Sequence, residues 1–310
     1  MRRPVSIVIP AYNSGDLLLH LLPQLLHLTR LDRGDEIIVV DDCSKDDSVR
    51  TVEAKFPAAS IIRNERNRGF AHTVNTGVGH AKNTIFMLLN TDISLPADFS
   101  LDPFVTMLES DETIFSITPK IIRKTPDGLR NESVPEVGLK KSGFDLNVLT
   151  LPDKYDRPRD ILYPCGGASF FDRDKFLKIG GLDTLYSPFY FEDFDLGLRA
   201  WRMGWKCIYE PSSSVNHAHQ GTIGTFNRRY VKLVGKRNYY LCLWKNFPSS
   251  MIFPSMFQGI IVSALKFRKY EILGIFWAML KVKEIFRRKT EIIKEKEVPF
   301  EEVKRIFYHS

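Results

Sequence analysis

Three short stretches of this sequence combine residue types that can carry chemistry. The first is FMLLNTDISLP (86–96), where an apolar run ends at Asn90, Thr91 and Asp92. A carboxylate just beyond a buried strand can hold a hard divalent cation, because Mg²⁺ and Mn²⁺ bind through one or two carboxylates together with phosphate oxygens and water. The plainer alternative is that Asp and Asn start a turn there. Asp92 is therefore a candidate ligand for Mg²⁺ or Mn²⁺.

The second stretch, SSSVNHAHQGTIG (212–224), carries two histidines. His217 and His219 stand two residues apart, so both would point to one side of an extended chain. An imidazole next to a carboxylate favours Mn²⁺, although Mg²⁺ stays open. The alternative is a pair of isolated surface histidines that bind nothing.

The third stretch, YFEDFDLGLRAW (190–201), has the spacing of a helix with acids in its first turn. The helix dipole would stabilise Glu192 and Asp193 there even without a function. Both acids also follow an aromatic run, YSPFYF (186–191). At the mouth of a crevice, a carboxylate in this place can act as a general base toward a hydroxyl group.

The elements that must position these residues follow one pattern in the first third of the chain. A short β-branched apolar run is followed by a polar cluster and then by a segment with helical spacing. Near-continuous apolar runs separated by helices are typical of parallel strands buried on both faces. The pattern predicts an α/β fold with a mostly parallel central sheet. Strands are predicted at 5–10, 36–40, 60–62, 84–89 and 113–118, and helices at 14–28, 46–55 (capped by Ser44) and 70–81.

Polar clusters follow the first four of these strands, at the point where each strand ends. Ligands of open α/β sheets bind outside the carboxyl ends of the strands, so the clusters predict one polar, acid-lined crevice. Each cluster alone could simply form a turn or cap a helix. No glycine-rich phosphate loop follows these strands, so a diphosphate in the crevice would need a divalent cation. The clusters are Tyr12 with Asn13, Asp41 with Asp42, 64–67 and 90–92.

The second half of the chain is less regular. Polar sequence with Gly and Pro predicts a loop-rich insertion between residues 123 and 163. Within the helix around Asp193, Asp195 can form an ion pair with Arg199, while Phe194, Leu198 and Trp201 share an inward face. Beyond the insertion, strands are predicted at 168–171 and 207–209, and helices at 173–179 and 192–203, the latter ending at Gly204.

The tail from residue 251 onward contains two strongly apolar segments, 251–265 and 270–280. Each is shorter than the roughly 20 residues that a bilayer span needs, so they are predicted to be packing or interfacial helices. The stretch 281–297 continues as a charged amphipathic helix with both signs of charge. Either its positive and negative side chains pair with one another in solvent, or its basic face binds anionic lipid.

Composition limits the classes of partner. The chain has 310 residues, 44% of them hydrophobic, and a formal net charge of +7, which suits nucleic acid, an anionic membrane surface or a phosphorylated substrate. Nucleic acid is disfavoured because no basic stripe with interleaved aromatics is present. The four cysteines show no C-x-x-C spacing and the N-terminal apolar run is too short for an export signal, so free thiols and a cytoplasmic location are expected.

Taken together, these stretches resemble the family-2 inverting glycosyltransferases of the GT-A fold, in particular their rhamnosyltransferase-like branch. The resemblance runs from residue 5 to about residue 224. It implies a Rossmann-like catalytic domain at 1–225, with a nucleotide-sugar-binding half (1–120) and an acceptor and catalytic half (121–225), followed by a C-terminal helical region (226–310). Its matching segments are VSIVIPAYN, IIVVDDCSKD, NERNRGFAHTVNTGV, LLNTDISLP, the run from GGASFF to RMGWK (166–206), and VNHAHQGTIG.

The resemblance also implies roles for individual residues. NTD stands where the family has a D-x-D-like metal motif, so Asp92 would hold the metal, and Asn90 in the first place leaves the ion with fewer protein charges. His217 matches a second metal or diphosphate ligand, with His219 as the fallback. Asp193 would be the catalytic base, with Glu192 either supporting it or binding the acceptor. Donor contacts are implied for Pro10, Ala11, Tyr12, Asn13 and Asp42 (base and ribose), for Asn67, Gly69 and Asn75 (the next wall), for Asn90 and Thr91, and for Arg237 (diphosphate), whose alternative is a surface arginine.

The implied activity is the transfer of a sugar such as rhamnose from a dTDP- or UDP-linked donor, with inversion. The acceptor would be a polysaccharide or a lipid-linked oligosaccharide in cell-surface glycan synthesis. The enzyme would act in the cytoplasm, where it could lie on the inner face of the membrane. Transfer of galactose or N-acetylglucosamine, or a non-catalytic sugar-nucleotide-binding role on the same fold, are the alternatives.

Overall fold

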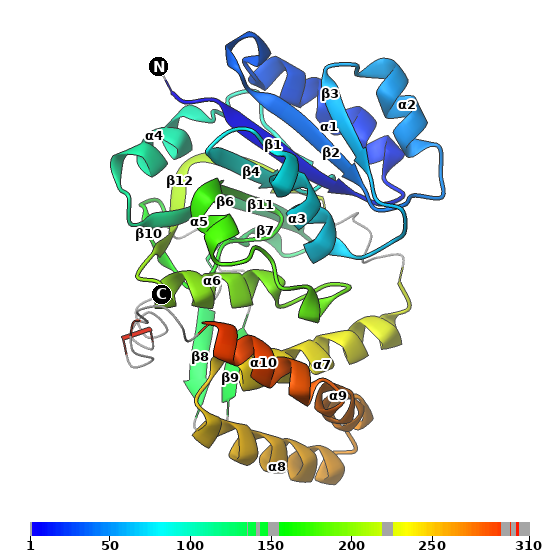
Figure 1. Ribbon diagram of the computed structural model, residues 1–310, viewed down its shortest axis with the longest axis vertical. Helices are drawn as coiled ribbons and strands as arrows, with labels where there is room; N and C mark the ends of the chain where they lie inside the picture. The colour runs from blue at the N-terminus through cyan, green and yellow to red at the C-terminus, as the bar shows by residue number, and fades with distance from the viewer. Residues whose placement is uncertain are drawn as a thin grey trace.

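A ten-stranded sheet forms the centre of the protein (Figure 1). The computed structural model describes residues 2–134, 136–140, 143–147, 155–218, 226–292, 298 and 302–303. The strand order is β10-β12-β6-β11-β4-β1-β2-β3, with β5 beside β12 and β7 beside β6. These strands are β1 (Val5–Ala11), β2 (Glu36–Asp41), β3 (Ala59–Arg63), β4 (Ile85–Leu89), β5 (Ile93–Ser94), β6 (Ile114–Thr125), β7 (Gly128–Asn131), β10 (Arg159–Ile161), β11 (Ala168–Asp172) and β12 (Lys206–His217).

Helices pack on both faces of this sheet, and a separate hairpin joins β8 (Glu136–Lys140) to β9 (Gly143–Asn147). The helices are α1 (Gly15–Leu28), α2 (Ser48–Lys55), α3 (Phe70–His80), α4 (Asp102–Ser110), α5 (Arg173–Lys178), α6 (Glu192–Arg202), α7 (Arg228–Asn246), α8 (Ser249–Leu265), α9 (Lys269–Met279) and α10 (Val282–Ile292).

The predicted α/β fold with a mostly parallel sheet is confirmed. Strands β1 to β4 run parallel to their neighbours among themselves, and β12 runs parallel to β6. One strand of the interior, β11, runs antiparallel to both β4 and β6. Its direction could not be read from the short apolar run, because such a run looks the same in either orientation.

Successive side chains of β1 pack into two different hydrophobic clusters, one on each face of the sheet, which explains why the strand is apolar throughout. Ile7 and Ile9 belong to the cluster that contains the buried leucines of α1, whereas Val8 belongs to the cluster that contains Val74 and Val78 of α3. Side chains alternate between the faces of a strand, so both faces of this sheet must be covered. Figure 1 shows α1 and α3 on opposite sides of the sheet.

Several predicted boundaries need correction. The strand predicted to end at 118 continues to Thr125, and the strand predicted at 207–209 is the centre of the longer β12. The stretch 123–163, predicted as loop, contains β7 to β10. Strands β7 and β10 were missed because they are short and polar, and β8 and β9 because an alternation of only two apolar residues is too brief to mark a strand.

Ser44 does not cap α2 as predicted. Asp47 is the N-cap residue and makes no side-chain capping bond, while the Ser44 hydroxyl accepts the main-chain N–H of Asn13 at 2.8 Å. The hydroxyl therefore joins the loops after β1 and β2 instead of starting a helix.

The C-terminal helices are packed into the body of the protein. Leu241, Leu243 and Phe247 of α7 are buried in the same cluster as Phe194 and Leu198 of α6. Figure 1 shows α6 between the sheet and helices α7 to α10. None of the helices in the described part of the chain has the length and apolar character needed to cross a membrane. A domain boundary near residue 225 stays a prediction.

Candidate active site

The carboxyl ends of β1, β2 and β3 lie side by side, as the polar clusters predict. In the parallel register Ala11 pairs with Asp41, and Asp41 pairs with Arg63. Main-chain hydrogen bonds continue past the strands, from Asp42 N–H to the Ala11 carbonyl and from Asn64 N–H to the Asp41 carbonyl, both at 2.8 Å. The clusters after the first three strands therefore form one corner of the protein.

Asp42 shapes this corner with its carboxylate. It is 4% exposed and accepts the main-chain N–H groups of Arg68 at 2.9 Å and Gly69 at 2.8 Å, as well as the Asn64 amide at 2.9 Å. Gly69 has a φ of +85°, and a Cβ there would lie 3.1 Å from the Pro188 main chain. The loop that carries the exposed Asn67 is thus fixed between Asp42 and the segment around Pro188.

Asn13 fixes the neighbouring loop. Its φ of +47° suits asparagine, its main-chain N–H bonds to Ser44, and its side-chain oxygen accepts the N–H of Lys45 at 2.8 Å. Ala11 is buried, whereas Pro10 and Tyr12 are half-buried and Asn13 is exposed. The loop from Pro10 to Asn13 is therefore a rigid, partly accessible edge of the corner.

Sheet pairing brings Asp92 and His217 together. The segment 90–92 connects β4 to β5, and β5 pairs with the end of β12 so that Ile93 stands opposite His217. The Asp92 carbonyl accepts the N–H of Ala218 at 3.0 Å. His217 Nε2 then lies 3.3 Å from Asp92 Oδ2. Both side chains are mostly buried, at 15% and 7% exposure.

Glu132 completes this group and was not predicted from the sequence. It follows β7, and its Oε2 lies 2.8 Å from His217 Nδ1. Burial alone would lower the pKa of His217, but the hydrogen bonds and charges of Asp92 and Glu132 raise it to about 9. His219 lies outside the described residues.

The geometry of this group fits a divalent cation. Adjacent ligand atoms of an octahedral ion with bonds of ~2.1 Å are about 3.0 Å apart, close to the 3.3 Å between Asp92 Oδ2 and His217 Nε2. A metal-binding histidine usually gives its other ring nitrogen to a carboxylate, as His217 does with Glu132. Among the described residues, Asn90 Oδ1 is buried and finds no hydrogen-bond partner, which marks a place where a ligand or water is needed.

The protein would supply few of the ligands of such an ion. In the described ranges no group of three or more His, Cys, Asp and Glu residues could hold a metal ion by itself. Asp92 and His217 would thus leave most coordination positions to phosphate oxygens and water, which is the usual arrangement for Mg²⁺ beside a bound nucleotide.

The two acids of α6 lie at the start of that helix. Asp193 Oδ1 accepts the N–H of Phe194 at 2.7 Å, and its Oδ2 faces the N–H of Gly166 at 3.4 Å. Burial raises the pKa of Asp193. Burial and the neighbouring charge of Asp193 raise the pKa of Glu192 to about 8, and within the described structure Glu192 Oε2 has no hydrogen-bond partner.

Gly166 and Gly167 join the two halves of the site. A Cβ on Gly166 would lie 3.5 Å from Asp193 Oδ2, and a Cβ on Gly167 would lie 3.7 Å from Asn90 Nδ2. The Gly167 carbonyl also accepts the N–H of Asn90 at 2.8 Å. Asp193 and the segment 90–92 therefore flank one pair of adjacent glycines, where side chains larger than hydrogen would fill the space between them.

Cys165 lies between the same two parts of the site, the acid of α6 and the group around His217. Burial raises its pKa to about 12, and the negative charges of Asp193 and Glu132 add to this effect. One thiol is thus close to the acid of α6 and to the carboxylate behind His217. All four cysteines are free, as predicted.

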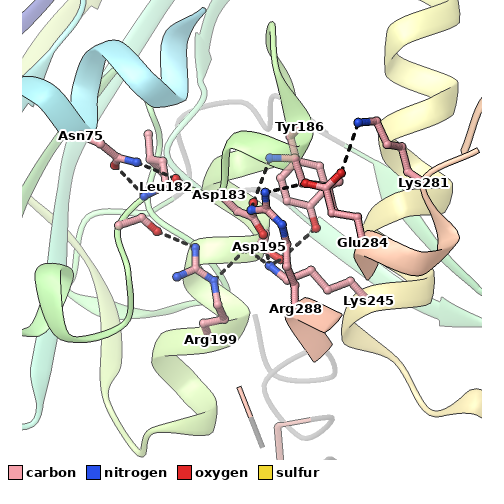
Figure 2. A network of polar contacts seen from close by, with 12 residues as sticks. Asn75, Leu182, Asp183, Tyr186, Asp195, Arg199, Lys245, Lys281, Glu284 and Arg288 are labelled. Carbon is pink, nitrogen blue, oxygen red and sulfur yellow. Dashed lines mark hydrogen bonds and ion pairs between the residues drawn. The ribbon is translucent and has the colours of Figure 1, made fainter. Parts of the chain in front are cut away.

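Asn75 and Arg237 occupy different surroundings from the other predicted donor contacts. The Asn75 amide bonds to both the N–H and the carbonyl of Leu182, at 2.9 and 2.8 Å (Figure 2). Arg237 is 7% exposed, donates to the carbonyls of Tyr186 and Ser187, and stacks on Trp277. The surface-arginine alternative is wrong, and a diphosphate contact by Arg237 stays a prediction.

A buried ionic network joins α6 to Asp183 and to helices α7 and α10 (Figure 2). The predicted pair of Asp195 and Arg199 is confirmed at 2.7 Å. Lys245 of α7 also binds Asp195, at 2.7 Å, and Asp183, at 2.6 Å, and Arg288 of α10 pairs with Asp183. Lys245 gave no signal in the sequence, because its partners come from separate segments.

Comparison with known proteins places the chain in a family. The model described as "Glycosyl transferase family 2" matches residues 6–180. Among curated proteins, the chain is 28% identical over 211 residues to an uncharacterized glycosyltransferase of Haemophilus influenzae, covering 67% of this chain and 63% of that protein. It spans 39% and 44% of two further curated relatives, so less than two thirds of each of the three.

Solved structures show the same fold. One is GalNAc-T7 with UDP, GalNAc and Mn²⁺, with a TM-score of 0.64, 17% identity, and coverage of 91% of this chain and 57% of that one. Another is the mannosyltransferase PcManGT from Pyrobaculum calidifontis with GDP-Man and Mn²⁺, with a TM-score of 0.56, 17% identity, and coverage of 91% and 87%. The predicted GT-A fold is confirmed, whereas the rhamnosyltransferase-like branch stays a prediction.

Proposed function

Because this chain belongs to glycosyl transferase family 2, we propose that it transfers a sugar from a nucleoside-diphosphate donor to an acceptor hydroxyl with inversion at the anomeric carbon. One observation carries the proposal. Asp193 lies against Gly166, Asn90 lies against the adjacent Gly167, and Asp92, two residues after Asn90, pairs with His217. A reacting sugar at this place would have a base on one face and its leaving group on the other.

Asp193 is the proposed catalytic base. Its carboxylate accepts the proton of the acceptor hydroxyl while that oxygen bonds to the anomeric carbon and the bond from this carbon to the diphosphate oxygen breaks. The raised pKa of Asp193, caused by burial, makes it a stronger base than an exposed aspartate. The N–H groups of Phe194 and Gly166 orient the carboxylate.

Asp92 and His217 are the proposed ligands of a Mg²⁺ or Mn²⁺ ion, and Glu132 orients the imidazole. Such an ion supplies positive charge to the departing diphosphate. Asn90 and Thr91 would contact the donor next to it. The corner made by Pro10 to Asn13, Asp42, Asn67 and Gly69 would hold the nucleoside, because it lies at the strand ends where open α/β sheets bind ligands.

Glu192 is proposed to hold the acceptor or donor sugar. Burial and the charge of Asp193 raise the pKa of Glu192, which favours the protonated carboxyl group, and this form can donate a hydrogen bond to a sugar oxygen. Asn75 and Arg237 are proposed to hold the segment from Leu182 to Ser187 in place, and the predicted contacts of Asn75 with the donor and of Arg237 with its diphosphate stay part of the proposal.

The identity of the transferred sugar is proposed from the sequence resemblance. The sequence resemblance favours rhamnose on dTDP or UDP, whereas the structures of similar fold carry GalNAc with UDP and mannose with GDP. The proposed acceptor is a saccharide or a lipid-linked oligosaccharide of the cell surface, met in the cytoplasm at the inner face of the membrane. Galactosyl or N-acetylglucosaminyl transfer remains the alternative specificity.

A screen of nucleotide sugars tests the proposal. Release of nucleoside diphosphate is measured for a set of dTDP-, UDP- and GDP-sugars with simple glycoside acceptors and Mn²⁺, and the product anomer is assigned by NMR. Asp193→Asn should lower transfer by about 10² to 10⁴ while nucleotide binding is retained. Asp174→Asn, an exposed acid in the first turn of α5, is the matched control.

Two results would count against this function. Transfer at an unchanged rate in Asp193→Asn would remove the base assignment. Nucleotide-sugar binding without any release of diphosphate by the wild type would favour the non-catalytic binding role.

A further inference from the structure

Helices α8 to α10 expose large apolar side chains at their turns. Phe267, between α8 and α9, is 93% exposed, and Leu280, between α9 and α10, is 81% exposed. Leu265, at the end of α8, is 75% exposed. Isolated apolar residues are common on protein surfaces, but such a concentration in one region marks an interaction site.

The exposed residues continue along α9 between these two turns. Leu273, Phe276 and Leu280 stand at i, i+3 and i+7, which places them on one face of the helix over about 10 Å. The opposite face, with Ile275 and Ala278, is buried in the core that α7 shares. The outer face of α9 is therefore apolar, and it connects the exposed apolar residues of the turns at its two ends.

Basic side chains surround this apolar face. Lys266, Arg268 and Lys269 flank Phe267, and Lys281 and Lys283 flank Leu280 and the start of α10; all five are exposed. Acids would offset their charge, yet the sequence from 265 to 289 contains only Glu271 and Glu284. Glu271 is paired with Lys236 at 2.6 Å, and Glu284 is shared between Arg288 at 2.7 Å and Lys281 at 3.2 Å, so the other four basic side chains keep their charge without an acid of this stretch.

The positive charge around the outer face of α9 indicates which kind of partner binds there. A second copy of this chain would bring the same positive face against it, and like charges across an interface disfavour association. An anionic bilayer offers both complements, since lipid chains accept the apolar side chains and headgroups attract lysine and arginine. Figure 1 shows α8 to α10 at the end of the molecule opposite β1 to β3.

We propose that the outer face of α8 to α10, with Phe267, Leu273, Phe276 and Leu280 at its centre, docks this protein on an anionic membrane surface. This surface rests on the membrane location that is part of the proposed function. Vesicle binding, however, needs neither the donor nor Asp193. Failure of docking and failure of catalysis are therefore measured separately.

Vesicle co-sedimentation tests the proposal with the whole chain. The wild type should bind vesicles of phosphatidylcholine with phosphatidylglycerol, and added salt should weaken the binding because surface charges are screened. The double variant Phe267→Asn with Leu280→Gln should bind at least about tenfold more weakly. Asparagine tolerates the φ of +51° at position 267, so the variant should fold as the wild type does, which circular dichroism checks.

Leu177→Gln is the matched control, because Leu177 of α5 is also an exposed leucine, at 42%, and lies outside this surface. It should bind vesicles like the wild type, and both variants should release nucleoside diphosphate from soluble substrates at the wild-type rate. The proposal is overturned if the wild type ignores anionic vesicles or if the double variant binds them equally well. A dimer that the double variant dissociates, or wild-type binding to acidic proteins in place of vesicles, would assign the surface to another partner.

Discussion

Lys245→Met should destabilise the protein far more than the loss of an ordinary surface lysine. Lys245 is 1% exposed, and its Nζ lies 2.6 Å from Asp183 Oδ2 and 2.7 Å from Asp195 Oδ1. Methionine keeps most of the length of the side chain but removes its charge. Two buried carboxylates then lose a shared cation.

The size of the stability loss depends on the partners that the two carboxylates keep. Removing one partner of a buried ion pair costs about 3–5 kcal/mol, because the other charge stays desolvated. Asp195 keeps Arg199 and the Asn246 amide, and Asp183 keeps Arg288, so we expect a loss near the lower end, about 3 kcal/mol.

Urea unfolding followed by tryptophan fluorescence measures the loss, with Lys236→Met as the control. Lys236 lies on the same helix and pairs with Glu271 at 2.6 Å, but it is 38% exposed, so its loss should cost only about 0–1 kcal/mol. Equal stability losses in the two variants would refute the reasoning that burial decides the cost.

The same variant has a pH signature. Burial alone would raise the pKa of Asp195, but the charges of Lys245 and Arg199 outweigh it and hold the pKa below its usual range. A depressed pKa in the folded state stabilises the protein above the unfolded value, near about 3.9, and this stabilisation is lost as the pH falls toward the folded pKa. The difference between wild type and Lys245→Met should therefore be full at neutral pH and shrink below about pH 4.

Two further predictions concern the site. Glu132→Gln should raise the Mn²⁺ concentration needed for half-maximal transfer by about 10- to 100-fold, since Glu132 orients His217; an unchanged Mn²⁺ response, measured by diphosphate release, would contradict that role. Transfer should also fall on acidification, because Asp193 must be ionised to accept a proton and burial raises its pKa above the usual value; a pH profile in which the rate rises toward acid would exclude Asp193 as the base.

Much of the sheet could be predicted because its strands are buried on both faces. A run such as residues 84–89 has no polar side and reads as a central strand wherever it occurs. The meeting of the first three polar clusters also followed from the sequence, since parallel strands end at the same edge. Strands such as β7 and β10 lack this signal, and their pairing depends on β6 and β12 being in place.

The site could be predicted where a residue follows a recognisable strand or starts a recognisable helix. Asp92 and Asp193 are in such positions. Glu132 is not, because its approach to His217 depends on the β6–β7 hairpin and on the register of β12 against β6. The bonding of Asn75 to Leu182 and the burial of Lys245 could not be predicted either, since their partners are distant in sequence and the burial of a lysine cannot be read from its neighbours.

Calorimetric titration of nucleoside diphosphates tests the central claim most directly, namely that Asp92 couples a divalent cation to the diphosphate of the donor. UDP, GDP and dTDP are titrated into the wild type, Asp92→Asn and the exposed control Asp98→Asn, each with and without Mn²⁺. The account predicts that the preferred nucleotide binds at least about tenfold more tightly with Mn²⁺, and that Asp92→Asn alone loses this gain. Affinity that does not respond to Mn²⁺, or an unchanged response in Asp92→Asn, would contradict it.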